Sequence, residues 1–180
     1  AALTKANLPL VVDISDHVGA LFTLGWWHND AFDATRSLIR DAAGQPVYGG
    51  TILAGGKIWT LPTSGLAPSS YDQTHVLYGA ELDGHFDNGW HWEAVASRYD
   101  YRHDLQHDAV ASSSSSAFGG PGSVADMGGS GWGTADLRSS GPLGGSNMLY
   151  AGAHLDRYVL DSRVQAASDW LGPADGAQTS

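Results

Sequence analysis

Apolar and polar residues alternate at every second position over several long stretches of this chain. Between His17 and Trp27 the even positions are Val18, Ala20, Phe22, Leu24 and Trp26, and Gly and Thr recur between them. The same period runs through His75–Phe86, Trp90–Tyr101, Gly131–Ser140 and Asn147–Arg157, and more weakly through Ser162–Trp170. A period of two predicts β-strands with one apolar and one polar face. Only Ala31–Ala43 has a spacing that would allow a helix of a few turns, and that spacing is irregular, so the predicted fold class is all-β.

The connections between these strands alternate in length. Asp87–Gly89 is an Asp-Asn-Gly hairpin turn, and Asp13–Asp16 and Gly141–Ser146 are also short. His28–Gln73 and Arg102–Ser130 are long, as is the stretch after Trp170. Two loops longer than about 15 residues are rare in an ordinary globular domain. Tight turns on one rim and long loops on the other are typical of an antiparallel up-and-down transmembrane β-barrel.

Strand length and aromatic placement favour the same interpretation. The strands run about ten to twelve residues, close to the roughly 9–11 that cross a bilayer. Trp90 and Trp92 follow one tight turn directly. The opposite strand ends, beside the long loops, carry Trp26, Trp27, Tyr99, Tyr101, Trp132 and Tyr158. We expect these residues to form two belts at the edges of an apolar, lipid-facing band.

Composition narrows the function classes further. The chain has 180 residues and a formal charge of −10, and its nine basic residues form no cluster. Nucleic acid is therefore not expected as a partner. The absence of cysteine excludes disulfide scaffolds, thiolate zinc sites and cysteine nucleophiles. No apolar run reaches the ~18 residues that a membrane-spanning helix needs.

Several segments resemble the barrel of TonB-dependent outer-membrane receptors of the siderophore type. The likeness lies in Leu24–Asp30, Ile39–Gly50, Leu77–Gly79, Glu93–Tyr101, Gly131–Arg138 and Gly152–Tyr158, and covers most of Val18–Trp170. The resemblance implies that residues 1–180 are a segment of such a barrel in the cell outer membrane, in contact with its lipid. It further implies import of a ferric siderophore or a similar nutrient, energised through TonB.

The chain also departs from that family. The family has a plug domain, an energy-coupling box and a barrel of 22 strands, and none of these is recognisable here. Six to eight strands are expected, and the polar ending Gln178–Ser180 resembles the middle of a loop. We therefore expect a partial barrel with long loops on one rim. TonB would act through a plug that this chain lacks.

Candidate catalytic and metal-ligating residues are few, and we expect neither an enzyme nor a cofactor. His103 and His107 would share one face of a helix and are weak metal candidates, as are His28, Asp30 and Asp33. Glu81 and Glu93 are the only glutamates. Pairing about Asn88 would bring them close together, but polar residues lining a barrel interior explain them better than a glycosidase pair. No residue is assigned to ligand binding.

Two alternatives remain open from the sequence. One is a complete small barrel of eight strands, with the two further strands inside Leu3–Val12 and Thr51–Leu61. The other is a secreted β-sandwich that binds carbohydrate through its tryptophans. In a sandwich Phe22, Leu24, Leu82 and Leu155 would point into one core, whereas in a barrel they would face lipid.

Overall fold

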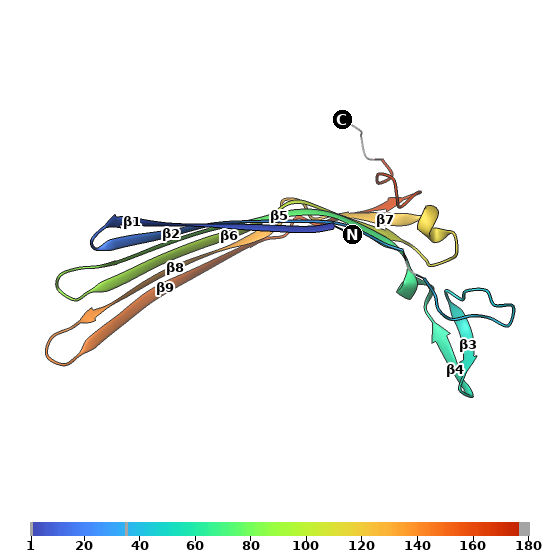
Figure 1. Cartoon of the computed structure of the whole chain (residues 1–180), viewed down its shortest axis with the longest axis horizontal. Coiled ribbons are helices and arrows are strands. Elements are labelled where there is room, and N and C mark those ends of the chain that lie inside the picture. Colours follow the sequence, from blue (N-terminus) through green and yellow to red (C-terminus); the bar gives the residue numbers. More distant parts are fainter. Residues whose placement is uncertain (1, 35, 177–180) are drawn as a thin grey trace.

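The computed structural model describes residues 2–34 and 36–176 as an elongated, curved antiparallel sheet (Figure 1). Its strands are β1 (Ala2–Ser15), β2 (Val18–Asp33), β5 (Ser69–His85), β6 (His91–Ala109), β7 (Gly122–Asp126), β8 (Gly131–Pro142), β9 (Met148–Val159) and β10 (Arg163–Ala167). A separate hairpin consists of β3 (Gly50–Ala54) and β4 (Lys57–Leu61). Two short 3₁₀ turns, η1 (Thr63–Leu66) and η2 (Ser116–Phe118), complete the described elements. The fold is all-β, as predicted.

Each long strand pairs with the next along the chain. The order is β1-β2-β5-β6, and the far edge of β6 pairs with β8 over His91–Asp100 and with β7 over Leu105–Ala109. β9 continues from β8, and β10 pairs with β7. β7 and β8 thus act as one interrupted strand, and β9 and β10 act as another. Counted in this way, the main sheet is a meander of six strands.

The three predicted short connections are confirmed, and long connections separate β2 from β5 and β6 from β7, although both are shorter than expected. Figure 1 shows the β1–β2, β5–β6 and β8–β9 turns together at one end of the sheet, and β3, β4 and β7 at the other. Gly89, in the predicted Asp-Asn-Gly turn, has a φ of +83°, which suits glycine in a tight hairpin. The β5–β6 register also matches the expectation of pairing about Asn88, since Asp83 lies opposite Glu93.

Strands occupy parts of the chain that were expected to be loop or helix. β2 continues to Asp33, β5 begins at Ser69 and β6 runs to Ala109. The helix that the spacing of Ala31–Ala43 would allow does not form: the start of this segment lies in β2, and no helix is present among the described residues of the remainder. The ladder with β5 (Asp30 opposite Asp72) keeps Ala31–Asp33 extended.

The sheet is open, because β1 and β9 are not paired with each other in the described part of the chain. Every residue of β1 and of β9 is exposed. Of the two strands that a complete eight-stranded barrel would need, Leu3–Val12 lies in the main sheet, whereas Thr51–Leu61 forms the separate β3–β4 hairpin. A closed barrel is therefore not what residues 2–34 and 36–176 form.

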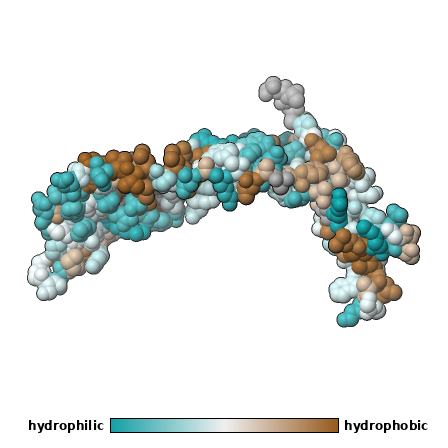
Figure 2. Space-filling model, in the orientation of Figure 1, coloured by the Kyte–Doolittle hydropathy of each residue, from teal (hydrophilic) through white to brown (hydrophobic). Residues whose placement is uncertain are grey.

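One face of the sheet near the short turns is apolar. Cross-strand register places Leu8, Leu10, Phe22, Leu24, Leu82, Leu137 and Leu155 on this face, which we call the apolar band. Leu8 is 66 % exposed and Leu155 67 %, and no second layer of described residues covers them. Figure 2 shows apolar side chains gathered along this part of the sheet, beside polar ones.

The few buried side chains gather at the long-loop end. Val124, Ala167 and Ala174 form a small cluster with Leu105 against it. Trp170 is fully buried, and its ring stacks on Phe32 at 5.7 Å between centroids. No helix among the described residues has the length and apolar character to cross a membrane.

Candidate functional site on the polar face

The face opposite the apolar band carries many polar and aromatic side chains, and we call it the polar face. A β-bulge at Arg102 determines which residues of β6 lie on this face. Thr74 pairs with His103 but His75 pairs with Tyr101, so Arg102 is an extra residue in β6. The bulge reverses the alternation, and Asp104 therefore joins Tyr99 and Tyr101 on one face.

A buried hydrogen-bond chain is centred on His75. Its Nε2 lies 2.8 Å from Oδ2 of Asp104, and its Nδ1 lies 3.0 Å from the hydroxyl of Tyr99. His75 is 7 % exposed and Asp104 4 %. An ionised carboxylate only accepts hydrogen bonds, so Nε2 donates to Asp104, and in a neutral imidazole Nδ1 then accepts from the Tyr99 hydroxyl. The imidazole is thereby fixed in one tautomer and one orientation.

Two amides extend this chain to the neighbouring strands. Gln73 donates from Nε2 to the second oxygen of Asp104 at 3.0 Å, and Asn29 donates from Nδ2 to Oε1 of Gln73 at 3.1 Å. No buried side-chain polar atom in the described residues lacks a partner. A satisfied network that joins β2, β5 and β6 holds this part of the sheet rigidly.

A row of rings crosses four strands beside the network. Trp27 of β2 contacts His75 of β5, with ring centroids 4.6 Å apart, and His75 stacks on Tyr101 of β6 at 4.0 Å and 8°. Tyr99 stacks on Trp132 of β8 at 4.5 Å and 21°. We call these five residues the aromatic row. The stacked faces contact each other within the row, so a ligand can reach only its exposed rings, such as Trp132, which is 41 % exposed.

The aromatic row corrects the prediction of two lipid-facing belts. By register, Trp27, Tyr99, Tyr101, Trp132 and Tyr158 lie on the polar face, because they share it with His75. Trp26 and Trp92 lie on the apolar side as expected. Adjacent residues such as Trp26 and Trp27 point to opposite faces of a strand, so proximity to a strand end does not assign a side.

A hollow of about 370 Å³ adjoins the network near β1. Lys5, Asn7, Trp27, His75 and Tyr99 are among its lining residues. It combines one cation, one amide and the edges of the aromatic row. Such a lining is suited to a small ligand that carries both a ring and an anionic or hydrogen-bonding group.

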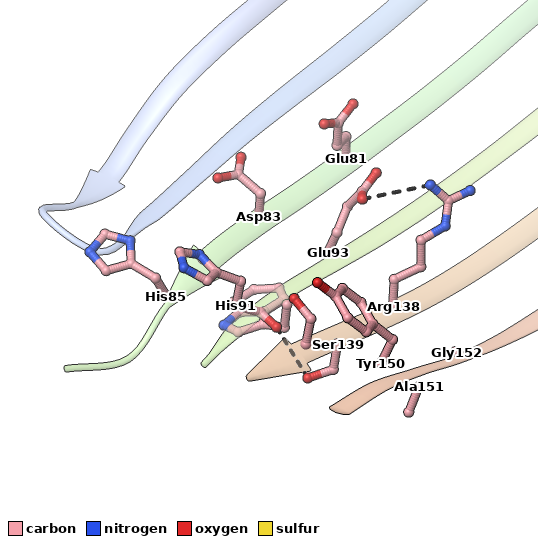
Figure 3. Close-up of a pocket in the computed structure, with 13 residues that line it drawn as sticks. Glu81, Asp83, His85, His91, Glu93, Arg138, Ser139, Tyr150, Ala151 and Gly152 are labelled. Atoms are coloured by element: carbon pink, nitrogen blue, oxygen red, sulfur yellow. Dashed lines mark hydrogen bonds and ion pairs between the residues drawn. The ribbon is translucent and has the colours of Figure 1, made fainter. Parts of the chain in front are cut away.

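A larger hollow of about 750 Å³ lies nearer the short turns, and several charged side chains are among those that line it (Figure 3). Oε2 of Glu93 lies 3.8 Å from Nη1 of Arg138, and Asp136 lies 3.8 Å from the other terminal nitrogen of Arg138. Glu81 and Asp83 complete the acidic lining. Glu93 faces Arg138 and lies opposite Asp83 rather than Glu81. These side chains form a solvated, charged surface. They do not resemble the acid and base of a glycosidase, which are held apart across a cleft.

The histidines predicted as weak metal candidates have other partners. His103 and His107 lie in β6 rather than in a helix, so the spacing of four residues does not bring them together. His103 Nε2 lies 3.2 Å from Oδ2 of Asp72, and His107 Nδ1 lies 2.7 Å from the carbonyl oxygen of Trp170. His28 contacts the Thr74 hydroxyl at 3.0 Å. Within the described residues no three or more His, Asp or Glu side chains are arranged to hold a metal ion.

The His75–Asp104 pair could not be predicted from a local pattern in the sequence. The two residues are 29 positions apart, and only the bulge at Arg102 brings Asp104 onto the face of His75. Comparison of the chain with protein-family models, with curated proteins and with solved structures found no match. The function is therefore argued from the geometry of the two faces.

Proposed function

We propose that this chain is part of the wall of an outer-membrane β-barrel receptor that imports a small nutrient. The observation that carries the proposal is the apolar band, which no second layer of described residues covers. From Val18 to Trp26 the apolar residues of β2 span about 26 Å at ~3.3 Å per residue. At the tilt of about 35–45° typical of transmembrane barrels, this length corresponds to a height of roughly 19–22 Å, somewhat less than their apolar band of about 25 Å. Arg98 and Arg157 lie on the same face at the level of Leu24 and bound the apolar band toward the long loops.

The polar face supports the same assignment. Charged and hydrogen-bonding side chains line it from Glu81 near the short turns to Asp104 near the long loops. A barrel wall needs apolar residues toward lipid and polar residues toward a water-filled or plugged lumen. In this proposal the charged hollow and the aromatic row face the lumen.

The open edges fit a segment of a larger barrel. Unpaired backbone N–H and C=O groups are too costly to leave in hydrocarbon, so β1 and β9 require partner strands in a membrane. We propose that further strands of the same barrel supply them. The resemblance to siderophore receptors then assigns the long-loop end to the outside, ferric siderophore as the ligand, and TonB with a plug domain as the source of energy.

Cysteine labelling tests the membrane assignment on the chain itself. The chain lacks cysteine, so Phe22→Cys, Leu24→Cys and Thr23→Cys each give one labelling site. After refolding into phospholipid vesicles, nitroxide labels at positions 22 and 24 should be relaxed by oxygen, which partitions into lipid. The label at the matched control position 23 should be relaxed by aqueous chromium oxalate. A monomer that melts cooperatively in plain buffer, with positions 22 and 24 protected from both reagents, would contradict the proposal.

Ligand capture needs a separate measurement. A ferric hydroxamate or ferric catecholate added to the refolded chain should quench tryptophan fluorescence saturably, because Trp27 and Trp132 lie on the polar face. Trp27→Phe should weaken that quenching, whereas Trp59→Phe, on the separate β3–β4 hairpin, should not. Quenching that rises linearly without saturation would argue against ferric ligands.

The aromatic row favours a second candidate function, carbohydrate binding, because sugar rings stack on exposed aromatic faces. Trp132 is 41 % exposed and lies over Tyr99. A soluble sandwich of this kind needs a second sheet over the apolar band, and the described residues supply only the small β3–β4 hairpin elsewhere. Saturable fluorescence changes with oligosaccharides in plain buffer, without detergent, would favour this candidate over the receptor.

A further inference from the structure

Three histidines lie side by side where the short turns meet the polar face. His17 is in the β1–β2 turn, His85 ends β5 and His91 begins β6. The backbone N–H of His85 donates to the carbonyl oxygen of His17 at 3.0 Å, and His85 is the register partner of His91. Figure 3 shows His85 and His91 next to each other at this end of the sheet.

His17 and His85 point ring nitrogens at each other. Nδ1 of His17 lies 3.0 Å from Nε2 of His85, and the two rings are 4.8 Å apart at 81°. Two imidazole nitrogens bound to one ion at about 2.0–2.1 Å lie about 2.9 Å apart at a right angle and about 3.3 Å apart at a tetrahedral angle. The observed separation falls between these values. The distance between the two nitrogens is therefore compatible with both of them binding one metal ion, once each ring turns its lone pair toward the ion.

The surroundings favour a cation. A hollow of about 400 Å³ adjoins the pair, and Asp13, Asp16 and Asp83 line it together with both histidines. Oδ1 of Asp87 lies 3.8 Å from Nε2 of His17. Among the residues that the structure describes, no lysine or arginine lines this hollow. Carboxylates on several sides raise the local concentration of cations and help to keep a bound ion in place.

We propose that His17 and His85 bind one divalent transition-metal ion of the imidazole-preferring class, such as Zn²⁺, Ni²⁺ or Cu²⁺. Water completes the coordination, since no third His, Asp or Glu in the described residues is arranged as a ligand. His91 is a neighbour rather than a ligand, with its ring centroid 5.9 Å from that of His85. The proposal does not depend on the receptor function, because it rests on side chains of the turn region alone.

Calorimetric titration of the full chain, without an added histidine tag, with Zn²⁺ and Ni²⁺ tests the site. We expect one site per chain, and a loss of affinity of at least about tenfold in His17→Ala and in His85→Ala. His154→Ala is the matched control, because His154 is exposed on the same face but bound between Asp136 and Asp156. Its affinity should equal that of the unmodified chain. Circular dichroism of each variant excludes loss of the fold, and His17→Gln replaces His17→Ala if the turn is disturbed.

Electron paramagnetic resonance of the Cu²⁺ complex gives a second readout, since modulation from two imidazoles differs from that of one. We expect two, reduced to one in His85→Ala. The proposal is overturned if no ion binds, if His154→Ala weakens binding as much as His17→Ala, or if His91→Ala abolishes binding while His17→Ala leaves it intact.

Discussion

Asp104 of β6 contacts the imidazole of His75 on the neighbouring strand β5. Its Oδ2 lies 2.8 Å from Nε2 of His75, and both side chains are buried. The pair bridges β5 and β6 just beyond the bulge that places Asp104 on the polar face. This contact links the hydrogen-bond chain to the aromatic row, because His75 belongs to both.

Asp104→Ala should destabilise the sheet by about 1–3 kcal/mol, because it leaves the buried N–H of His75 and the amide of Gln73 without an acceptor. Asp30→Ala is a control, since Asp30 is exposed and lies in the neighbouring β2. Urea unfolding followed by circular dichroism measures both. Equal midpoints for the two variants would mean that the buried pair adds nothing to stability.

Trp170 organises the long-loop end. Its indole N–H donates to the carbonyl oxygen of Ser116 at 2.8 Å, and its backbone N–H donates to that of Gly120 at 2.8 Å. Trp170→Ala should cost about 3–5 kcal/mol of local stability, because it empties a fully buried site. Amide hydrogen exchange should then accelerate in residues 112–121 but not in the β8–β9 hairpin. Trp59→Ala, at a half-exposed tryptophan, should leave both regions unchanged.

Much of the sheet could be predicted from the sequence where one face is apolar. The strands were predicted correctly at Val18–Trp26 and on both sides of the Asp87–Gly89 turn, because alternation and hairpin chemistry are local signals. The β5–β6 register followed from the turn alone. The same reasoning failed beyond Trp27 and Arg102, where both faces of the strands carry polar side chains.

The missed features depend on contacts distant in sequence. β1 was expected only as one strand of a complete eight-stranded barrel, and β7 was assigned to a loop, since five residues of Gly, Ser, Val, Ala and Asp carry no clear alternation. The bulge at Arg102 changes which residues share a face, so neither Asp104 nor the aromatic row could be assigned to the polar face from a fixed period of two.

Two glycines within strands should respond differently to alanine. A Cβ at Gly131 would lie 2.3 Å from the carbonyl oxygen of Tyr99, a backbone atom that the ladder holds in place. A Cβ at Gly79 would meet only Thr23, at an ordinary 3.4 Å. Gly131→Ala should therefore destabilise by about 1–3 kcal/mol, whereas Gly79→Ala should be neutral or slightly stabilising. Thermal or urea unfolding of the two variants, side by side, measures the difference, and an equal loss in both would contradict it.

Asp175 should titrate below the ordinary range of an aspartate. The hydroxyl and the backbone N–H of Ser168 both donate to its Oδ1, at 2.5 and 2.9 Å, and these bonds lower the pKa of the carboxyl from the ordinary value of 3.8. The pKa is lower in the folded chain than in the unfolded one. Asp175 therefore stabilises the fold at pH values above the ordinary pKa of an aspartate. This contribution is lost as the pH falls through the folded pKa. Carbon-13 NMR of the carboxyl measures the titration directly. In Ser168→Ala, which loses the hydroxyl but keeps the backbone donor, the pKa should rise part of the way back, and an unchanged value would show that the hydroxyl contributes nothing.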